Sequence, residues 1–170
     1  MQLMYNNFAV SALLRKKLFM ETVARRRYPV GIQTFSEIRK GDYIYVDKTD
    51  LVWEMTQMKY VFLSRPRRFG KSLLSSTLHS YFDGRCDLFE GLKIMDLEKD
   101  WEQYPVIHLD VSCAKNQRNA NELQDAIMFM MEPLAERFGR TKNEKTPGRL
   151  LSGMIRRAYE QTVKQVAVII

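Results

Sequence analysis

The spacing of apolar residues predicts three short helices in the first half of the chain, at residues 34–40, 49–58 and 71–82. Apolar side chains recur at helical intervals in the third of these segments, which indicates one buried face. Gly41 and Gly84 follow the first and the third helix and are typical helix ends.

Polar residues at the start of several segments support these boundaries. Thr34 followed three residues later by Glu37 is a capping-box pattern, and Thr49 is a candidate cap for the second helix. Further on, a threonine–proline pair opens a helix that we expect over residues 146–163.

A long amphipathic segment at residues 121–138 predicts another helix, with a kink or break at Pro133 because proline cannot donate the helical hydrogen bond. The polar stretch that follows, residues 139–145, is the best candidate for local disorder. Residues 43–46 are β-prone but short.

Three apolar runs predict buried strands at residues 60–63, 106–109 and 166–170. Helical segments separate these runs, and strands that alternate with helices favour a parallel sheet. We therefore expect an α/β fold with a parallel sheet and helices on both faces.

Composition limits the class of protein. The chain has 170 residues, 45% of them hydrophobic and 28% charged, which suits one globular domain. No apolar run reaches the ~20 residues of a membrane span, so we expect no membrane partner. Cys86 and Cys113 lack metal-ligand spacing and are too few for a disulfide framework, which favours the cytoplasm and a structural role for both.

The formal net charge of +7 is concentrated at the front of the chain. Residues 1–41 carry eight basic and two acidic side chains, whereas the other 129 residues carry 19 basic and 18 acidic ones. Within the front end, residues 11–27 read as a helix. This basic extension is an ordinary surface helix, a targeting segment, or sequence upstream of a start at Met20.

The clearest chemical signal is a predicted strand followed by Gly70, Lys71 and Ser72, which open a predicted helix. Glycine lets the backbone approach an anion, and the amides and dipole of a helix start attract one. Lys71 would reach the β- and γ-phosphates of a nucleotide, and Ser72 would offer its hydroxyl to Mg²⁺. The P-loop pattern G-x-x-x-x-G-K-[ST] has glycine where this chain has Arg65.

Arg65, Arg67 and Arg68 surround this loop, and such a cluster is favourable when an anion lies among the guanidinium groups. The sequence therefore predicts ATP and Mg²⁺ as ligands, with Lys71 in the catalytic role. The predicted nucleotide-binding residues are Arg65, Pro66, Arg67, Arg68, Phe69, Gly70, Lys71, Ser72 and Leu73.

The segment F-L-S-R-P-R-R-F-G-K-S-L-L at residues 62–74 resembles the AAA-ATPase-like proteins common in anaerobic bacteria, whose later part is a PD-(D/E)xK nuclease domain. Further segments fit the same family: Y-P-V-G-I-Q-T-F at 28–35, Y-V-D-K-T at 45–49, Y-F-D-G at 81–84, L-F-E-G-L at 88–92 and K-D-W-E-Q-Y-P-V-I-H-L-D at 99–110. The resemblance implies a P-loop NTPase fold, and Arg65 is part of its pattern.

The resemblance also implies that the strand at residues 166–170 runs into an Asp-Glu pair, the Walker B acids, which lie beyond Ile170. We therefore expect a basic helical extension at 1–27 and the N-terminal part of a nucleotide-binding domain at 28–170. The full-length protein is expected to hydrolyse ATP and could act on nucleic acid. Whether this fragment is an enzyme, and its oligomeric state, stay open.

Other readings of the residues remain. A nucleic-acid-binding module could use the loop arginines and the basic front end. Asp110 matches a Walker B acid by pattern, although a cap or turn role is favoured. Asp47 and Lys48 either border the nucleotide or pair with each other, and His79 and His108 are expected to be packing or surface residues.

Overall fold

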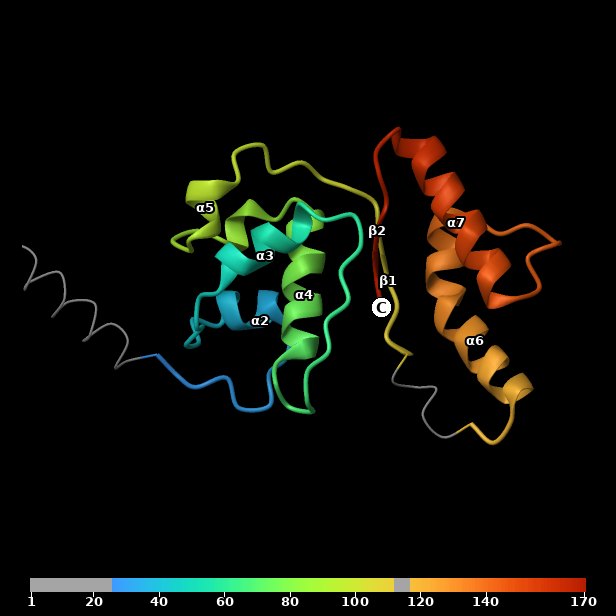
Figure 1. Ribbon diagram of the computed structural model, residues 1–170, viewed down its shortest axis with the longest axis horizontal. Helices are drawn as coiled ribbons and strands as arrows, with labels where there is room; N and C mark the ends of the chain where they lie inside the picture. The colour runs from blue at the N-terminus through green and yellow to red at the C-terminus, as the bar shows by residue number, and fades with distance from the viewer. Residues whose placement is uncertain (1–25, 112–116) are drawn as a thin grey trace, which may run out of the picture.

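The computed structural model describes residues 26–111 and 117–170 (Figure 1). The elements are α2 Phe35–Lys40, α3 Thr49–Thr56, α4 Lys71–Phe82, the 3₁₀ turn η1 Cys86–Leu88, α5 Ile94–Leu97, β1 Val106–His108, α6 Ala120–Phe138, α7 Pro147–Thr162 and β2 Ala167–Ile169. The helix predicted over residues 11–27 lies outside the described residues, apart from its last two. Within the described ranges, no helix combines the length and apolar content of a membrane span.

A parallel pair of strands lies between two groups of helices (Figure 1). β1 pairs with β2 in a register that places Val106 opposite Ala167 and His108 opposite Ile169. Helices α2 to α5 lie on one side of the strands, and α6 and α7 lie on the other (Figure 1). The predicted α/β class with a parallel sheet and helices on both faces is confirmed, with a two-stranded sheet among the described residues.

The buried apolar residues form two clusters, one on each side of the strands. The cluster on the α6 and α7 side comprises Ile107, Leu109, Met131, Ala135, Phe138, Leu150, Met154 and Ala158. The cluster among α2 to α5 comprises Phe35, Val52, Tyr81, Leu88, Phe89, Leu92 and Ile94. Trp53 and Trp101 pack against the second cluster, so both tryptophans have packing roles.

Side-chain caps fix the starts of the two long helices. Asn119 accepts a hydrogen bond from the Glu122 amide at the start of α6, and Thr146 accepts one from the Arg149 amide at the start of α7. Of the kink or break predicted at Pro133, the break is wrong, because α6 continues through this residue.

Three predictions about the first half of the chain are wrong in detail. Residues 43–46 form only an isolated bridge, between Arg27 and Tyr43. The side chain of Thr34 does not cap α2. Thr49 lies inside α3, and the Asp47 carboxylate accepts hydrogen bonds from both its amide and its hydroxyl.

The strand predicted at residues 60–63 is also absent from the sheet. This stretch has no regular secondary structure, and Tyr60 and Phe62 are 84% and 93% exposed. Its amides have no backbone acceptor in the described part of the chain. An apolar run predicts a buried strand, but a strand also needs a neighbouring edge to pair with, and the run itself does not specify one.

The segment predicted as disordered, residues 139–145, is held in place by a buried ion pair. Both carboxylate oxygens of Glu144 accept hydrogen bonds from Arg157, at 2.7 and 3.0 Å. The Thr141 amide donates to the same carboxylate, and Arg157 also donates to the Phe138 and Gly139 carbonyls. The ion pair therefore ties the connection between α6 and α7 to the body of α7.

Replacing Glu144→Gln tests this tie. The hydrogen bonds from Arg157 lower the pKa of the Glu144 carboxyl from 4.5 to about 2. The stability from the pair is therefore present above the ordinary carboxyl pKa and is lost as the pH falls toward about 2.

We expect the free-energy difference between wild type and Glu144→Gln, measured by urea unfolding, to shrink steadily as the pH falls from 4.5 to 2. Glu160→Gln, an exposed position on α7, serves as the control and should show no such trend. A constant difference between wild type and Glu144→Gln over this range would contradict the assignment.

Candidate functional site

The predicted phosphate loop enters α4 through two residues in the left-handed region. Gly70, the N-cap of α4, has φ +74°, and Arg68 has φ +67°. A β-carbon at Gly70 would meet no atom within 4 Å. Glycine is therefore favoured here by its backbone angle, since the surrounding space is open.

The first turn of α4 offers backbone donors for which the described residues supply no acceptor. No side chain caps the helix, and its first hydrogen bond runs from the Leu74 amide to the Gly70 carbonyl. The amides of Lys71, Ser72 and Leu73 have no acceptor in the described part of the chain. They lie at the positive end of a 12-residue helix, which favours an anion.

The side chains of the loop are exposed around these amides. Residues 64–72 are all exposed, and Leu73 is half-buried against the second apolar cluster. The Lys71 ammonium donates to the Arg65 carbonyl at 2.9 Å, so the lysine turns back over the loop. None of the loop arginines forms an ion pair with a described acidic residue.

Asp47, one of the secondary candidates, has a structural role. One oxygen of its carboxylate accepts from Thr49, and the other accepts from the Lys93 amide at 2.8 Å. Asp47 thus links the starts of α3 and α5. The predicted alternative of a pair with Lys48 is wrong, because no ion pair joins these two described residues.

The two histidines face each other from α4 and β1. The ring centroids of His79 and His108 lie 5.6 Å apart. Burial lowers the pKa of His108, and the neighbouring His79 adds to this effect while Asp110 opposes it. The contact between the two rings at the sheet fits the packing role expected for both.

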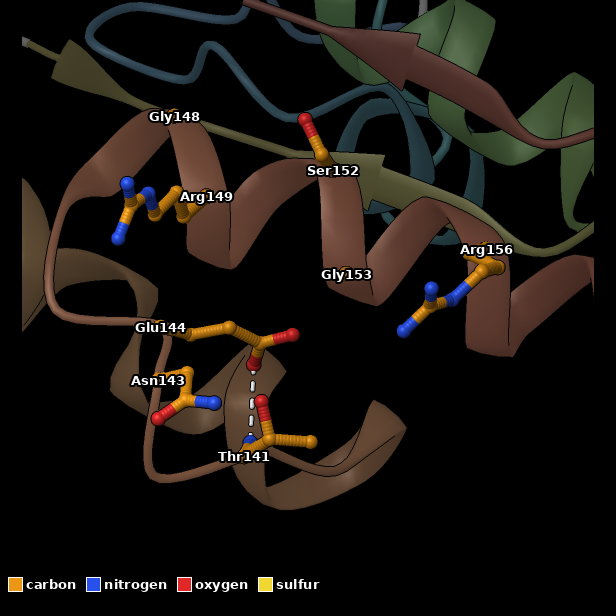
Figure 2. Close-up of a pocket in the computed structure, with 8 residues that line it drawn as sticks. All are labelled: Thr141, Asn143, Glu144, Gly148, Arg149, Ser152, Gly153 and Arg156. Atoms are coloured by element: carbon orange, nitrogen blue, oxygen red, sulfur yellow. Dashed lines mark hydrogen bonds between the residues drawn. The ribbon is translucent and has the colours of Figure 1, made fainter.

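Two surface hollows lie away from the loop. One of about 490 Å³ includes Tyr81, whose hydroxyl donates to Glu98; burial and this carboxylate raise the tyrosine pKa to about 12. The other, of about 720 Å³, lies beside the α6–α7 connection (Figure 2).

No group of three histidine, cysteine or acidic side chains among the described residues could hold a metal ion.

The second hollow was not found by sequence reasoning. The charge count took residues 42–170 as one nearly neutral block, which concealed a strongly basic stretch at residues 139–157. A count over shorter windows would have located it.

The left-handed backbone at Gly70 predicts the effect of substitutions there. We expect Gly70→Ala to lower the free energy of unfolding by about 1–2 kcal/mol, because a β-carbon disfavours this conformation. Gly70→Asn should cost less, since asparagine adopts it more readily. Gly148→Ala in α7, where φ is not positive and nothing lies within 4 Å, should not destabilise. Urea unfolding distinguishes these outcomes, and an Ala variant as stable as wild type would contradict the backbone assignment.

Comparisons with known proteins bear on these residues. The family model described as "Predicted AAA-ATPase" matches residues 29–170. An "Uncharacterized protein in vnfD 5'region" of Azotobacter chroococcum mcd 1 is 34% identical over 151 residues, which are 87% of this chain and 29% of that protein. No solved structure matches. The chain thus spans 29% of the length of this relative, and it belongs to the AAA-ATPase-like family.

Proposed function

We propose that this chain binds ATP at the loop of residues 65–73, with the phosphates at the start of α4. The observation that carries the proposal is the uncapped first turn of α4, where three unoccupied amides follow a left-handed glycine. An anion at this position would accept hydrogen bonds from amides that have no acceptor in the described part of the chain. Membership in the AAA-ATPase-like family supports a nucleotide as that anion.

Individual side chains would contribute in different ways. Lys71 would exchange its contact with the Arg65 carbonyl for the β- and γ-phosphates, a stronger charge-assisted interaction. The exposed guanidinium groups of Arg65, Arg67 and Arg68 would add positive charge around the triphosphate.

The residues also fit a magnesium ion that arrives with the nucleotide. Mg²⁺ in such sites binds phosphate oxygens, water and only one or two protein oxygens. The Ser72 hydroxyl, exposed in the first turn of α4, would supply one of them. The bound ion would neutralise charge that develops on the phosphates during transfer.

A P-loop fold would require a third strand, and we assign residues 60–63 to this position in the nucleotide-bound domain. This apolar stretch leads into α4, and α4 packs against both β1 and β2. β2 pairs with β1 alone among the described residues, so its other edge is open. A strand–helix–strand crossover would bring residues 60–63 parallel to the existing pair. Their pairing with β2 would fix the loop relative to the sheet.

Hydrolysis is proposed only for a protein that also supplies the Walker B acids, which the family resemblance implies after residue 170. The C-terminal nuclease domain and a cytoplasmic location also stay predictions. The alternative module, in which the loop arginines bind nucleic acid, is not favoured because the family match points to nucleotide chemistry.

The first test replaces the lysine. Lys71→Ala should weaken Mg·ATP binding about 10- to 100-fold, because a hydrogen bond between charged groups contributes about 1.5–3 kcal/mol. Isothermal titration of the wild type and the variant measures the difference. Lys99→Ala removes an exposed lysine elsewhere and should leave the affinity unchanged. Equal ATP affinity of Lys71→Ala and wild type would remove the proposed site.

A second test follows the proposed third strand by hydrogen exchange. The amides of residues 61–63 have no backbone acceptor in the described part of the chain and should exchange fast in the free protein. Saturating Mg·ATP should slow their exchange at least tenfold if the segment pairs with β2. Amides in the middle of α6, already hydrogen-bonded, should change little. Unchanged exchange at residues 61–63 under saturation would exclude the added strand while leaving ATP binding intact.

A further inference from the structure

The α6–α7 connection and the first part of α7 form the most basic stretch of the described chain outside the loop. Residues 139–157 carry six basic side chains and one acidic one, a net charge of +5. The basic residues are Arg140, Lys142, Lys145, Arg149, Arg156 and Arg157. All of them except Arg157 are exposed.

The single acid of this stretch does not offset that charge at the surface. Glu144 is 7% exposed, and both of its oxygens bind Arg157. A β-carbon at Gly153 would lie 1.8 Å from a Glu144 oxygen, so the carboxylate packs directly on the α7 backbone. The buried Glu144–Arg157 pair is therefore fixed and nearly neutral, so Glu144 does not compensate the charge of the exposed basic residues.

The hollow of about 720 Å³ lies beside this ion pair, and Glu144 is one of its lining residues (Figure 2). Arg149 and Arg156 reach into the open space beside α7 from positions seven residues apart (Figure 2). At ~1.5 Å rise per residue, their attachment points are about 10 Å apart along the helix. Ser152 lies between them along α7, and Asn143 lies across the hollow on the α6–α7 connection (Figure 2).

The two arginines are available for a ligand. The Arg149 side chain has no acidic partner among the described residues. Arg156 lies 3.9 Å from Glu160, with both side chains mostly exposed, and such pairs contribute little.

We infer that this hollow binds the phosphate backbone of a nucleic acid strand. In one strand of a duplex successive phosphates advance about 3.4 Å along the axis, so side chains attached about 10 Å apart suit phosphates about three nucleotides apart. Contacts of this kind neutralise phosphates without reading the bases. The site is separate from the ATP loop and shares none of its residues.

The structure distinguishes this partner from two others that carry phosphate. A membrane surface is bound by basic residues together with exposed apolar ones, and none of the large apolar side chains at residues 139–157 is exposed. A single small phosphate would suit cations that converge on one point, whereas the two guanidinium groups stand apart (Figure 2).

The test uses the 170-residue chain and a fluorescent 20-nucleotide oligothymidine, with binding followed by anisotropy over a series of salt concentrations. In Arg149→Gln/Arg156→Gln, affinity at 0.1 M salt should fall roughly tenfold. The slope of log K against log salt should become shallower by about 1.4, because about 0.7 is lost per contact with a single strand. The basic residues at the front of the chain add equal background to both proteins.

A matched control removes the same charge elsewhere. Lys99→Gln/Arg118→Gln changes two exposed basic residues outside the hollow and should leave both affinity and slope close to wild type. Lys71→Ala should also bind the oligonucleotide normally, which separates this proposal from the ATP site. Circular dichroism confirms that each variant is folded.

Three results would overturn the inference. The hollow variant could retain the wild-type affinity and slope, or the control pair could lose as much as the hollow pair. Alternatively, the hollow variant could lose binding to inorganic phosphate or to vesicles of phosphatidylglycerol while its oligonucleotide binding stays at the wild-type level. The last result would assign the site to a small anion or to a membrane surface.

Discussion

The parallel pairing of β1 with β2 is the contact on which the rest of this structure depends. It joins residues that lie about 60 positions apart in the sequence, with α6 and α7 between them. The paired strands are only three residues long, so backbone hydrogen bonds alone would not hold them. Their stability comes from the helices on each face: the α6–α7 cluster includes Ile107 of β1, and on the other face α4 packs against both strands.

This arrangement places the candidate site where the helices meet the sheet. α4 packs against both strands, so its position is fixed by the sheet, while its first turn stays uncapped and open to solvent. A rigid helix with unsatisfied amides at one end is less stable than a capped one, but it is ready to bind an anion. The same helix therefore links the packing of the domain to the proposed phosphate chemistry.

Much of the fold could be predicted because the signals were local. The bounds of α4 follow from its apolar spacing and from Gly70 and Gly84, and the start of α7 follows from Thr146 and Pro147. The strands at 106–109 and 166–170 were found within one residue at each end.

The failures concern features that depend on distant parts of the chain. Residues 60–63 have strand-like composition, but pairing requires an edge that composition does not reveal. Residues 139–145 are polar and predict disorder, because the sequence does not reveal that the buried partner of Glu144 is Arg157, 13 positions further along the chain in α7. The loop of residues 65–73 is proposed as a phosphate site from its residues alone, whereas the basic hollow depends on two arginines that only the helix brings to one face.

Gly153 shows how such a long-range contact restricts the sequence. Glycine inside a helix costs about 1 kcal/mol relative to alanine, so position 153 looks like a simple place to stabilise α7. Here the β-carbon of alanine would displace the Glu144 carboxylate, which anchors the connection between α6 and α7. α7 therefore retains a residue of low helix propensity near its centre, because this residue leaves room for the Glu144 carboxylate. Substitutions chosen only to raise the helix propensity of α7 would destabilise the connection between α6 and α7.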